Sequence, residues 1–179
     1  MYIKQDLPQF QDQRTLIVAT GRQEAIFYLT FNGEIEEKER IQVEDPGYTD
    51  KEGSYKNSDG SQGIFKAGSI YKEKITYHIT REFLNELEEK MKKFQQKNKT
   101  AEIYLFCPDY LNKEILKKLP KSLKQKLKVV KFGNYVHSHP FDLLKSIKED
   151  QESNKDKVAT PIKEKALKIL KKTKKNSDQ

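Results

Sequence analysis

The residues best suited to chemistry stand in the segment Asp59-Gly60-Ser61-Gln62-Gly63. Glycine backbone can approach a ligand closely because no side chain intervenes. The amide of Gln62 both donates and accepts hydrogen bonds, so it could orient a water molecule. Lys66, Lys72 and Lys74 follow this segment and suit contacts to phosphate. On composition alone, a solvated loop with incidental glycines is the simpler interpretation.

Other residues of reactive or metal-binding types lack the partner residues that catalysis or metal binding needs. Cys107 follows an apolar run and precedes Pro108 with no evident base, so we expect a small buried residue. His137 and His139 flank one serine, but no third metal ligand is evident, and we expect neither metal nor cofactor. The expected first strand, residues 15–20, has no carboxylate, which argues against a metal-dependent nuclease.

Positive charge is concentrated at the C-terminal end. The chain of 179 residues has 35 Lys and Arg against 27 Asp and Glu, a net charge of +8. Residues 153–179 hold nine lysines and three acidic residues, so the rest is nearly neutral. Clustered lysine attracts polyanions, although it could also only keep a tail soluble. The residues we expect to contact nucleic acid there are Lys168, Lys171, Lys172, Lys174 and Lys175.

Composition narrows the class of protein. Hydrophobic residues make up 35% of the chain and mean hydropathy is −0.91, so part of it should lie outside the core. No apolar run approaches the roughly 20 residues of a membrane span, and the first residues lack a secretory signal. A single cysteine excludes an internal disulfide framework. We therefore expect a cytoplasmic protein without a membrane span; its oligomeric state is not indicated.

The first 70 residues predict a β-meander followed by a long loop. Apolar runs predict strands over 15–20 and 24–31, and Asn32-Gly33 is a strong hairpin signal. Alternation over 34–44 predicts a third, half-exposed strand. Five of the eight glycines then fall between residues 44 and 70, which predicts a long loop that is functional or disordered.

The remainder predicts helices alternating with strands. Apolar residues recur every four positions over 71–97, which predicts a long helix with one buried stripe. We expect strands at 100–106 and 128–132 and helices at 110–119, from a Ser122 cap to Leu127, and at 140–149. The fold class is therefore α/β, a mixed β-sheet flanked by helices.

Three regions follow from this order. Residues 1–13 are expected to form a loose N-terminal arm, residues 14–150 the α/β domain, and residues 151–179 a linker and a Lys-rich helix. That last helix has a narrow apolar stripe of Ile162, Ala166 and Ile169, which could dock in the groove of a protein partner.

Three short motifs resemble a known family: His78-x-x-Arg81-Glu82-Phe83, the run from Ile103 to Pro108, and Val136–Ile147 with Pro140. With the order of elements, they resemble the central domain of archaeal and eukaryotic class-1 peptide-chain release factors. They are similar also to its stand-alone bacterial and archaeal relatives, often called host-attachment proteins. The resemblance covers about residues 14–149 and implies release-factor domain 2, a ribonuclease H-like fold.

The resemblance implies a role in translation. Release factors carry a Gly-Gly-Gln tip before their long helix, and here Gly60-Ser61-Gln62 matches it, with Ser61 in place of the second glycine. Gln62 would then be catalytic, Gly60 would shape the loop, and Lys66, Lys72 and Arg81 would contact phosphate. We expect a ribosome- or tRNA-associated protein, and peptidyl-tRNA hydrolysis as the reaction if there is one. The alternative is a non-catalytic interaction or surface-attachment module that uses the C-terminal helix.

Overall fold

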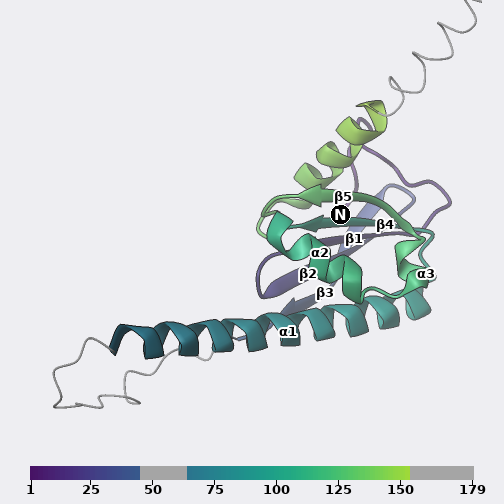
Figure 1. Ribbon diagram of the computed structural model, residues 1–179. Coiled ribbons are helices and arrows are strands. Elements are labelled where there is room, and N and C mark those ends of the chain that lie inside the picture. Colours follow the sequence, from purple (N-terminus) through teal and green to yellow (C-terminus); the bar gives the residue numbers. More distant parts are fainter. Residues whose placement is uncertain (45–63, 154–179) are drawn as a thin grey trace, which may run out of the picture.

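The computed structural model describes the backbone of residues 1–44 and 64–153, and the side chains of residues 1–44 and 77–153 (Figure 1). Within this part of the chain a five-stranded sheet has the order β3-β2-β1-β4-β5. β1 is antiparallel to β2 and parallel to β4; β2–β3 are antiparallel and β4–β5 parallel. The strands are β1 (Thr15–Thr20), β2 (Glu24–Phe31), β3 (Glu34–Gln42), β4 (Glu102–Cys107) and β5 (Leu127–Phe132).

Helices cover both faces of this sheet. The helices α1 (Ile64–Asn98), α2 (Asp109–Lys118) and α3 (Lys121–Lys124) pack on one face, where Phe27, Phe83 and Leu105 belong to one buried cluster. The helical residues 140–153 and the N-terminal residues cover the other face, where Leu144 packs with Ile17 and Phe106. The prediction of a mixed sheet flanked by helices is therefore confirmed.

The β2–β3 hairpin turns where the sequence indicated. Asn32 has a φ of 47° and Gly33 a φ of 79°, a pair of positive angles that Asn-Gly adopts at low cost. The strand bounds of β1 and β2 agree with the predicted ranges. β4 begins two residues later than predicted and extends through Cys107.

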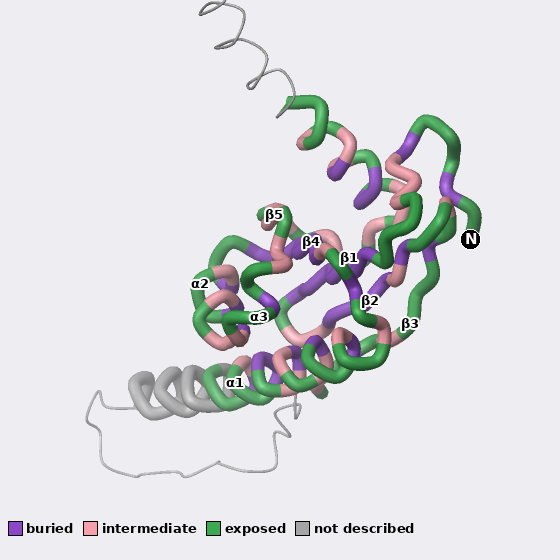
Figure 2. The backbone as a smooth tube through the Cα atoms, turned by 90° about the vertical axis from the view of Figure 1, so that its right-hand side faces the viewer, coloured by how far each residue is buried: buried purple, intermediate pink, exposed green. Residues whose placement is uncertain are grey.

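The buried residues of α1, purple in Figure 2, lie on the side of the helix that faces the sheet. Phe83, Leu87 and Met91 are each at most 1% exposed. The predicted start at residue 71 is wrong, because α1 begins at Ile64. Residues 64–70 lack a clear apolar repeat, but Lys66 and Ala67 favour helix, and a helical glycine such as Gly68 costs only about 1 kcal/mol.

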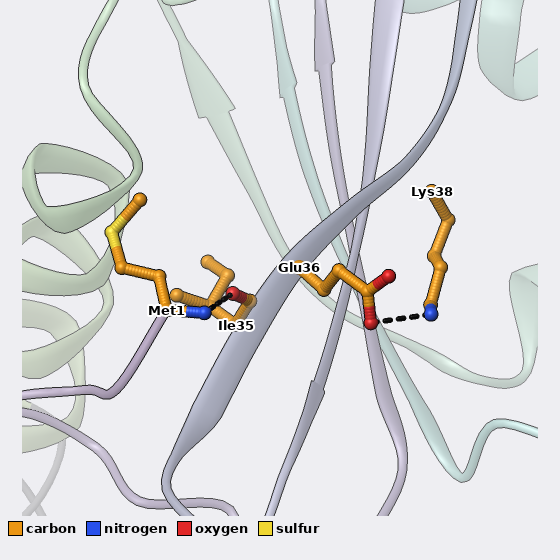
Figure 3. Close-up of polar contacts among 4 residues, drawn as sticks. All are labelled: Met1, Ile35, Glu36 and Lys38. Atoms are coloured by element: carbon orange, nitrogen blue, oxygen red, sulfur yellow. Dashed lines mark hydrogen bonds and ion pairs between the residues drawn. The ribbon is translucent and has the colours of Figure 1, made fainter.

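The N-terminal arm is not loose. The backbone N–H of Ile3 donates to the Gly33 carbonyl oxygen at 2.7 Å, and the Met1 ammonium to the Ile35 carbonyl oxygen at 3.1 Å. Figure 3 shows Met1 against Ile35, beside the ion pair of Glu36 and Lys38 on β3. Ile3 and Leu7 are buried in the core. Tertiary contacts, rather than any local repeat, hold this segment.

Two local predictions also need correction. Ser122 does not cap α3, because the helix starts at Lys121 after Pro120, whose φ of −65° suits a helix start. The last described helix does not end at residue 149 but continues to residue 153, so the first part of the expected linker is helical. Ser153 donates its hydroxyl hydrogen to the Glu149 carbonyl oxygen at 2.8 Å, which satisfies one backbone group at that end.

Candidate nucleic-acid interface

The predicted site residues fall into three groups. Gly60 and Gln62 lie outside the described residues, as do Lys168, Lys171, Lys172, Lys174 and Lys175. Lys66, Lys72 and Lys74 lie on the helical backbone of α1, and their side chains are outside the described part. Arg81 is fully described, and its side chain is exposed on α1. The structure thus places four of these residues on one helix.

The N-terminal part of α1 projects beyond the sheet (Figure 1). Of the α1 side chains that are described, Ile79 is the first that is buried. At 1.5 Å of rise per residue, the helix from Ile64 to that point is about 20 Å long. Gln62 precedes Ile64 by two positions in the sequence. The projecting end of α1 is therefore the described part of the chain that is covalently closest to Gln62.

An aromatic and cationic surface lies where α1 leaves the sheet. Tyr77 is 65% exposed, and its ring contacts that of His78 edge to face, with centroids 6.1 Å apart. Arg81 lies one helical turn after Tyr77, and residues four apart share a helix face. Exposed aromatic rings can stack on nucleic-acid bases while cations contact the phosphates. Tyr77 was not a predicted site residue; its spacing from Arg81 was the available signal.

The C-terminal half of α1 is electrostatically different. Lys92 Nζ lies 2.6 Å from Glu88 Oε1, Lys93 Nζ pairs with Glu89 at 2.5 Å, and Lys90 pairs with Glu39 on β3. The Glu39 partner raises the pKa of Lys90, and the Lys93 partner lowers the pKa of Glu89. These cations are neutralised within the fold, whereas Arg81 forms no ion pair with a described residue.

The two loop histidines have separate partners. His137 Nε2 lies 3.0 Å from Glu24 Oε1, and His139 Nδ1 accepts a hydrogen bond from the Phe141 N–H at 3.2 Å. The second contact occupies His139 at the start of the helical residues 140–153. Among residues with described side chains, no group of three His, Cys, Asp or Glu could hold a metal ion.

The ends of β1 and β4 hold no reactive group. Cys107 is completely buried, and burial, reinforced by Asp109, raises the pKa of its thiol to about 11. A thiol with that pKa is a poor nucleophile at neutral pH. At the end of β1, Thr20 donates its hydroxyl hydrogen to the Phe106 carbonyl oxygen at 3.3 Å. This edge of the sheet is closed by internal contacts.

No helix in the described part of the chain is long and apolar enough to cross a membrane. Helices α1, α2 and the helical residues 140–153 each present charged residues to solvent.

Comparison with known proteins adds a distant structural likeness. No protein-family model matches the chain, and no curated protein matches it. A crystal structure of an archaeal translation termination factor is similar over 82% of this chain and 41% of that one, with 13% identity and a TM-score of 0.45. A structure described only as an archaeal protein is similar over 67% of this chain and 29% of its own, with 15% identity and a TM-score of 0.43. This chain spans less than half the length of either protein.

Proposed function

We propose that this protein associates with the ribosome or with tRNA and acts in translation, with the projecting end of α1 facing RNA. The observation that carries this proposal is the place of Gly60-Ser61-Gln62 in the sequence, immediately before a 35-residue helix that projects beyond the sheet. The resemblance to the release-factor central domain, a ribonuclease H-like fold, gives this arrangement a known use.

A projecting helix suits delivery of a short loop into a confined site. The sheet and its covering helices form a broad body, whereas a single helix with its side chains is about 10–12 Å wide. The projecting part of α1 could enter a space that the body cannot, and it would bring Gln62 with it. Lys66, Lys72 and Lys74 would line the entering segment with cations.

The surface of Tyr77, His78 and Arg81 would make the next contacts with RNA. Tyr77 is exposed and could stack on an unpaired base. Arg81, which pairs with no described carboxylate, would contact a phosphate. The tail lysines, Lys168 to Lys175, would add a sequence-independent and salt-sensitive contribution to affinity.

Hydrolysis of peptidyl-tRNA is the reaction this arrangement would support. The Gln62 amide would orient a water molecule toward the ester carbonyl that links the peptide to tRNA. Ser61 has a Cβ where release factors have their second glycine, which restricts the backbone conformations available beside Gln62. Gly60 would keep the remaining freedom of the loop.

Co-sedimentation with ribosomes of the source organism tests the association. The full chain should pellet at 50 mM salt and much less at 500 mM. Tyr77→Ala with Arg81→Gln should reduce pelleting, whereas Lys92→Gln, which removes a paired cation, should not. Absence of pelleting at low salt would overturn the proposal. Binding to a protein partner that is insensitive to salt and is lost in Ile169→Asp would instead support the interaction module.

Release of labelled peptide from ribosome-bound peptidyl-tRNA tests the chemistry. Gln62→Ala should abolish release while pelleting is kept, and Ser61→Gly should maintain or increase it. Release that is unchanged in Gln62→Ala would show that this residue is not catalytic.

A further inference from the structure

A second cationic surface lies on the folded body, away from α1's projecting end. It consists of the lysines on α2, on α3 and in the connection to β5, which we call the α2–α3 lysine surface: Lys113, Lys117, Lys118, Lys121, Lys124 and Lys126. Between Lys113 and Lys126 Glu114 is the single acidic residue, and Asp109 stands at the start of α2. The body is nearly neutral as a whole, so its net charge does not reveal this local excess of lysine.

None of these six lysines is neutralised by a described carboxylate. Several other cations of the body pair with carboxylates, such as Lys131 with Asp150 at 2.6 Å and Lys145 with Asp142 at 3.1 Å. On the α2–α3 lysine surface the described contacts are to neutral acceptors. Lys118 donates to the Asn85 side-chain oxygen, and Lys126 to the Thr100 carbonyl oxygen at 2.8 Å. The ion pair of Lys128 with Glu102, at 3.0 Å, lies just beyond this surface in the sequence.

Packing directs these lysines outward. Leu111, Ile115 and Leu119 are buried against the core shared with α1 and the sheet, and Leu123 anchors α3 in the same way. Lys113, Lys117, Lys121 and Lys124 are exposed. Lys113 and Lys117 are one helical turn apart, which separates neighbouring Cβ atoms by about 5–6 Å. The surface thus presents several separated charges rather than a pocket for one anion.

We propose that the α2–α3 lysine surface binds the phosphodiester backbone of RNA, as a contact separate from those of α1 and of the C-terminal tail. The choice of RNA rests on the function proposed above. The unpaired cations suit a polymer with regularly spaced phosphates, and contacts to phosphates carry no sequence information, so this contribution to binding is independent of sequence.

An anionic membrane fits this surface less well. Helices that bind membranes insert an apolar face between the lipids. The apolar face of α2 is already buried against the sheet, and the exposed positions from Lys113 to Lys124 are polar or charged. RNA needs only the cations that are present.

The test compares two triple variants of the full chain with equal charge changes. Lys117→Gln, Lys121→Gln and Lys124→Gln remove exposed, unpaired cations of the surface. The control, Lys92→Gln, Lys93→Gln and Lys145→Gln, removes exposed cations that pair with carboxylates. Binding of a fluorescent 30-nucleotide mixed-sequence RNA is measured by anisotropy from 50 to 300 mM salt, beside DNA of the same sequence and vesicles containing phosphatidylserine.

The surface variant should bind RNA at least about tenfold more weakly at 50 mM salt. The slope of log association constant against log salt concentration should fall in magnitude by about 2 for the three lysines, because each phosphate contact on a single strand contributes about 0.7. The control should change less than threefold. The charge-preserving Lys→Arg triple should bind like the parent, which separates lost charge from misfolding. Equal losses in both Gln triples would overturn the proposal, as would losses confined to vesicles.

Failure of this proposal can be told from failure of the proposed function. If the surface variant still pellets with ribosomes and its RNA affinity is unchanged, the proposed RNA contact of the α2–α3 lysine surface is overturned. The proposed role in translation is then unaffected. RNA binding that depends on Lys117, Lys121 and Lys124 without any ribosome pelleting would support RNA binding by the α2–α3 lysine surface. It would contradict the proposed association with the ribosome. DNA of the same sequence should bind about as tightly, because the surface contacts phosphates alone. The assignment to RNA is therefore tested by ribosome pelleting, which should fall in the surface variant.

Discussion

The ammonium group of Lys126 lies 2.8 Å from the carbonyl oxygen of Thr100. This contact joins the residues before β5 to the connection between α1 and β4. The same oxygen accepts a hydrogen bond from Gln95 Nε2 at 2.9 Å, and Thr100 is completely buried. Lys126 therefore links the segment before β5 to the segment before β4.

Lys126→Met should lower the free energy of unfolding by about 1 kcal/mol, because it removes one charge-assisted hydrogen bond and keeps most of the aliphatic stem. The loss stays small because Gln95 still satisfies the Thr100 oxygen. Urea denaturation measures it, with Lys124→Met as the matched control, since Lys124 is exposed and has no described partner. Equal values for the two variants would contradict the structural role of the contact.

Phe83→Ala should lower the free energy of unfolding by about 3–5 kcal/mol, because it removes a fully buried ring between α1 and the sheet. Tyr77→Ala, two turns earlier on the same helix, should change it by less than about 0.5 kcal/mol, because its ring is exposed. Thermal and chemical denaturation of both variants check this. A mild effect of Phe83→Ala would mean that α1 is not anchored through this residue.

The part of α1 that packs on the sheet could be predicted because burial leaves a repeat in the sequence. Phe83, Leu87 and Met91 recur every four residues and are buried. The stretch from Ile64 to Ile70 carries no such clear repeat, so its helical state had no strong apolar signal. The N-terminal arm was missed for a related reason: Ile3 and Leu7 are buried by contacts with distant residues, and an irregular segment has no periodicity.

The candidate site was only partly accessible to sequence reasoning. A short motif suggested Arg81 as a phosphate contact; the structure shows that it is exposed on α1, and its role stays a prediction. The α2–α3 lysine surface depends on which lysines find carboxylates. Lys92 and Lys117 look alike in the sequence, but only Lys92 has a described ion-pair partner. The difference arises because Lys92 has a glutamate, Glu88, four residues before it on the same helix, whereas no carboxylate lies within ion-pair distance of Lys117 in the described part of the chain.

Gly133→Ala should lower the free energy of unfolding by about 1–3 kcal/mol. Gly133 has a φ of 148°, and an added Cβ would lie 2.7 Å from Tyr135 Cε2. The Tyr135 ring packs edge to face on Phe106 with centroids 5.0 Å apart, so its displacement would disturb the core. Combining Gly133→Ala with Tyr135→Ala in a double-mutant cycle separates steric clash from backbone strain. An unchanged melting temperature for Gly133→Ala would refute this account.

Cys107 should resist alkylation by iodoacetamide at pH 8 in the folded protein and react after unfolding in guanidinium chloride. Burial raises the pKa of its thiol from 9.0 to about 11, so the folded state disfavours the thiolate. The associated stability is fully present below pH 9 and is lost as the pH rises toward 11. Rapid labelling of the folded protein at pH 8 would contradict this placement.

Tyr28 and Tyr104 should add to the loss of stability at still higher pH, because burial raises the pKa of both phenols above 10.0. Cys107→Ala should therefore flatten the decline of stability between pH 9 and 10, and it should lessen but not remove the decline above pH 10, where the two phenols contribute. Denaturation midpoints measured from pH 7 to 11 distinguish the two contributions. A decline between pH 9 and 10 that is identical in both proteins would assign it to other groups.

In the described part of the chain, α1 is held on the sheet by buried side chains of its second half, and a rigid helix transmits any tilt along its length. Phe83, Leu87 and Met91 fix its direction, while its first residue lies about 20 Å beyond the first described buried position. A tilt of about 5° at the core would displace that far end by about 2 Å, more than the rise of about 1.5 Å per helical residue. A small repacking beneath the helix therefore causes a larger displacement at its N-terminal end. A substitution in the core can change the position of Ile64 without contacting it.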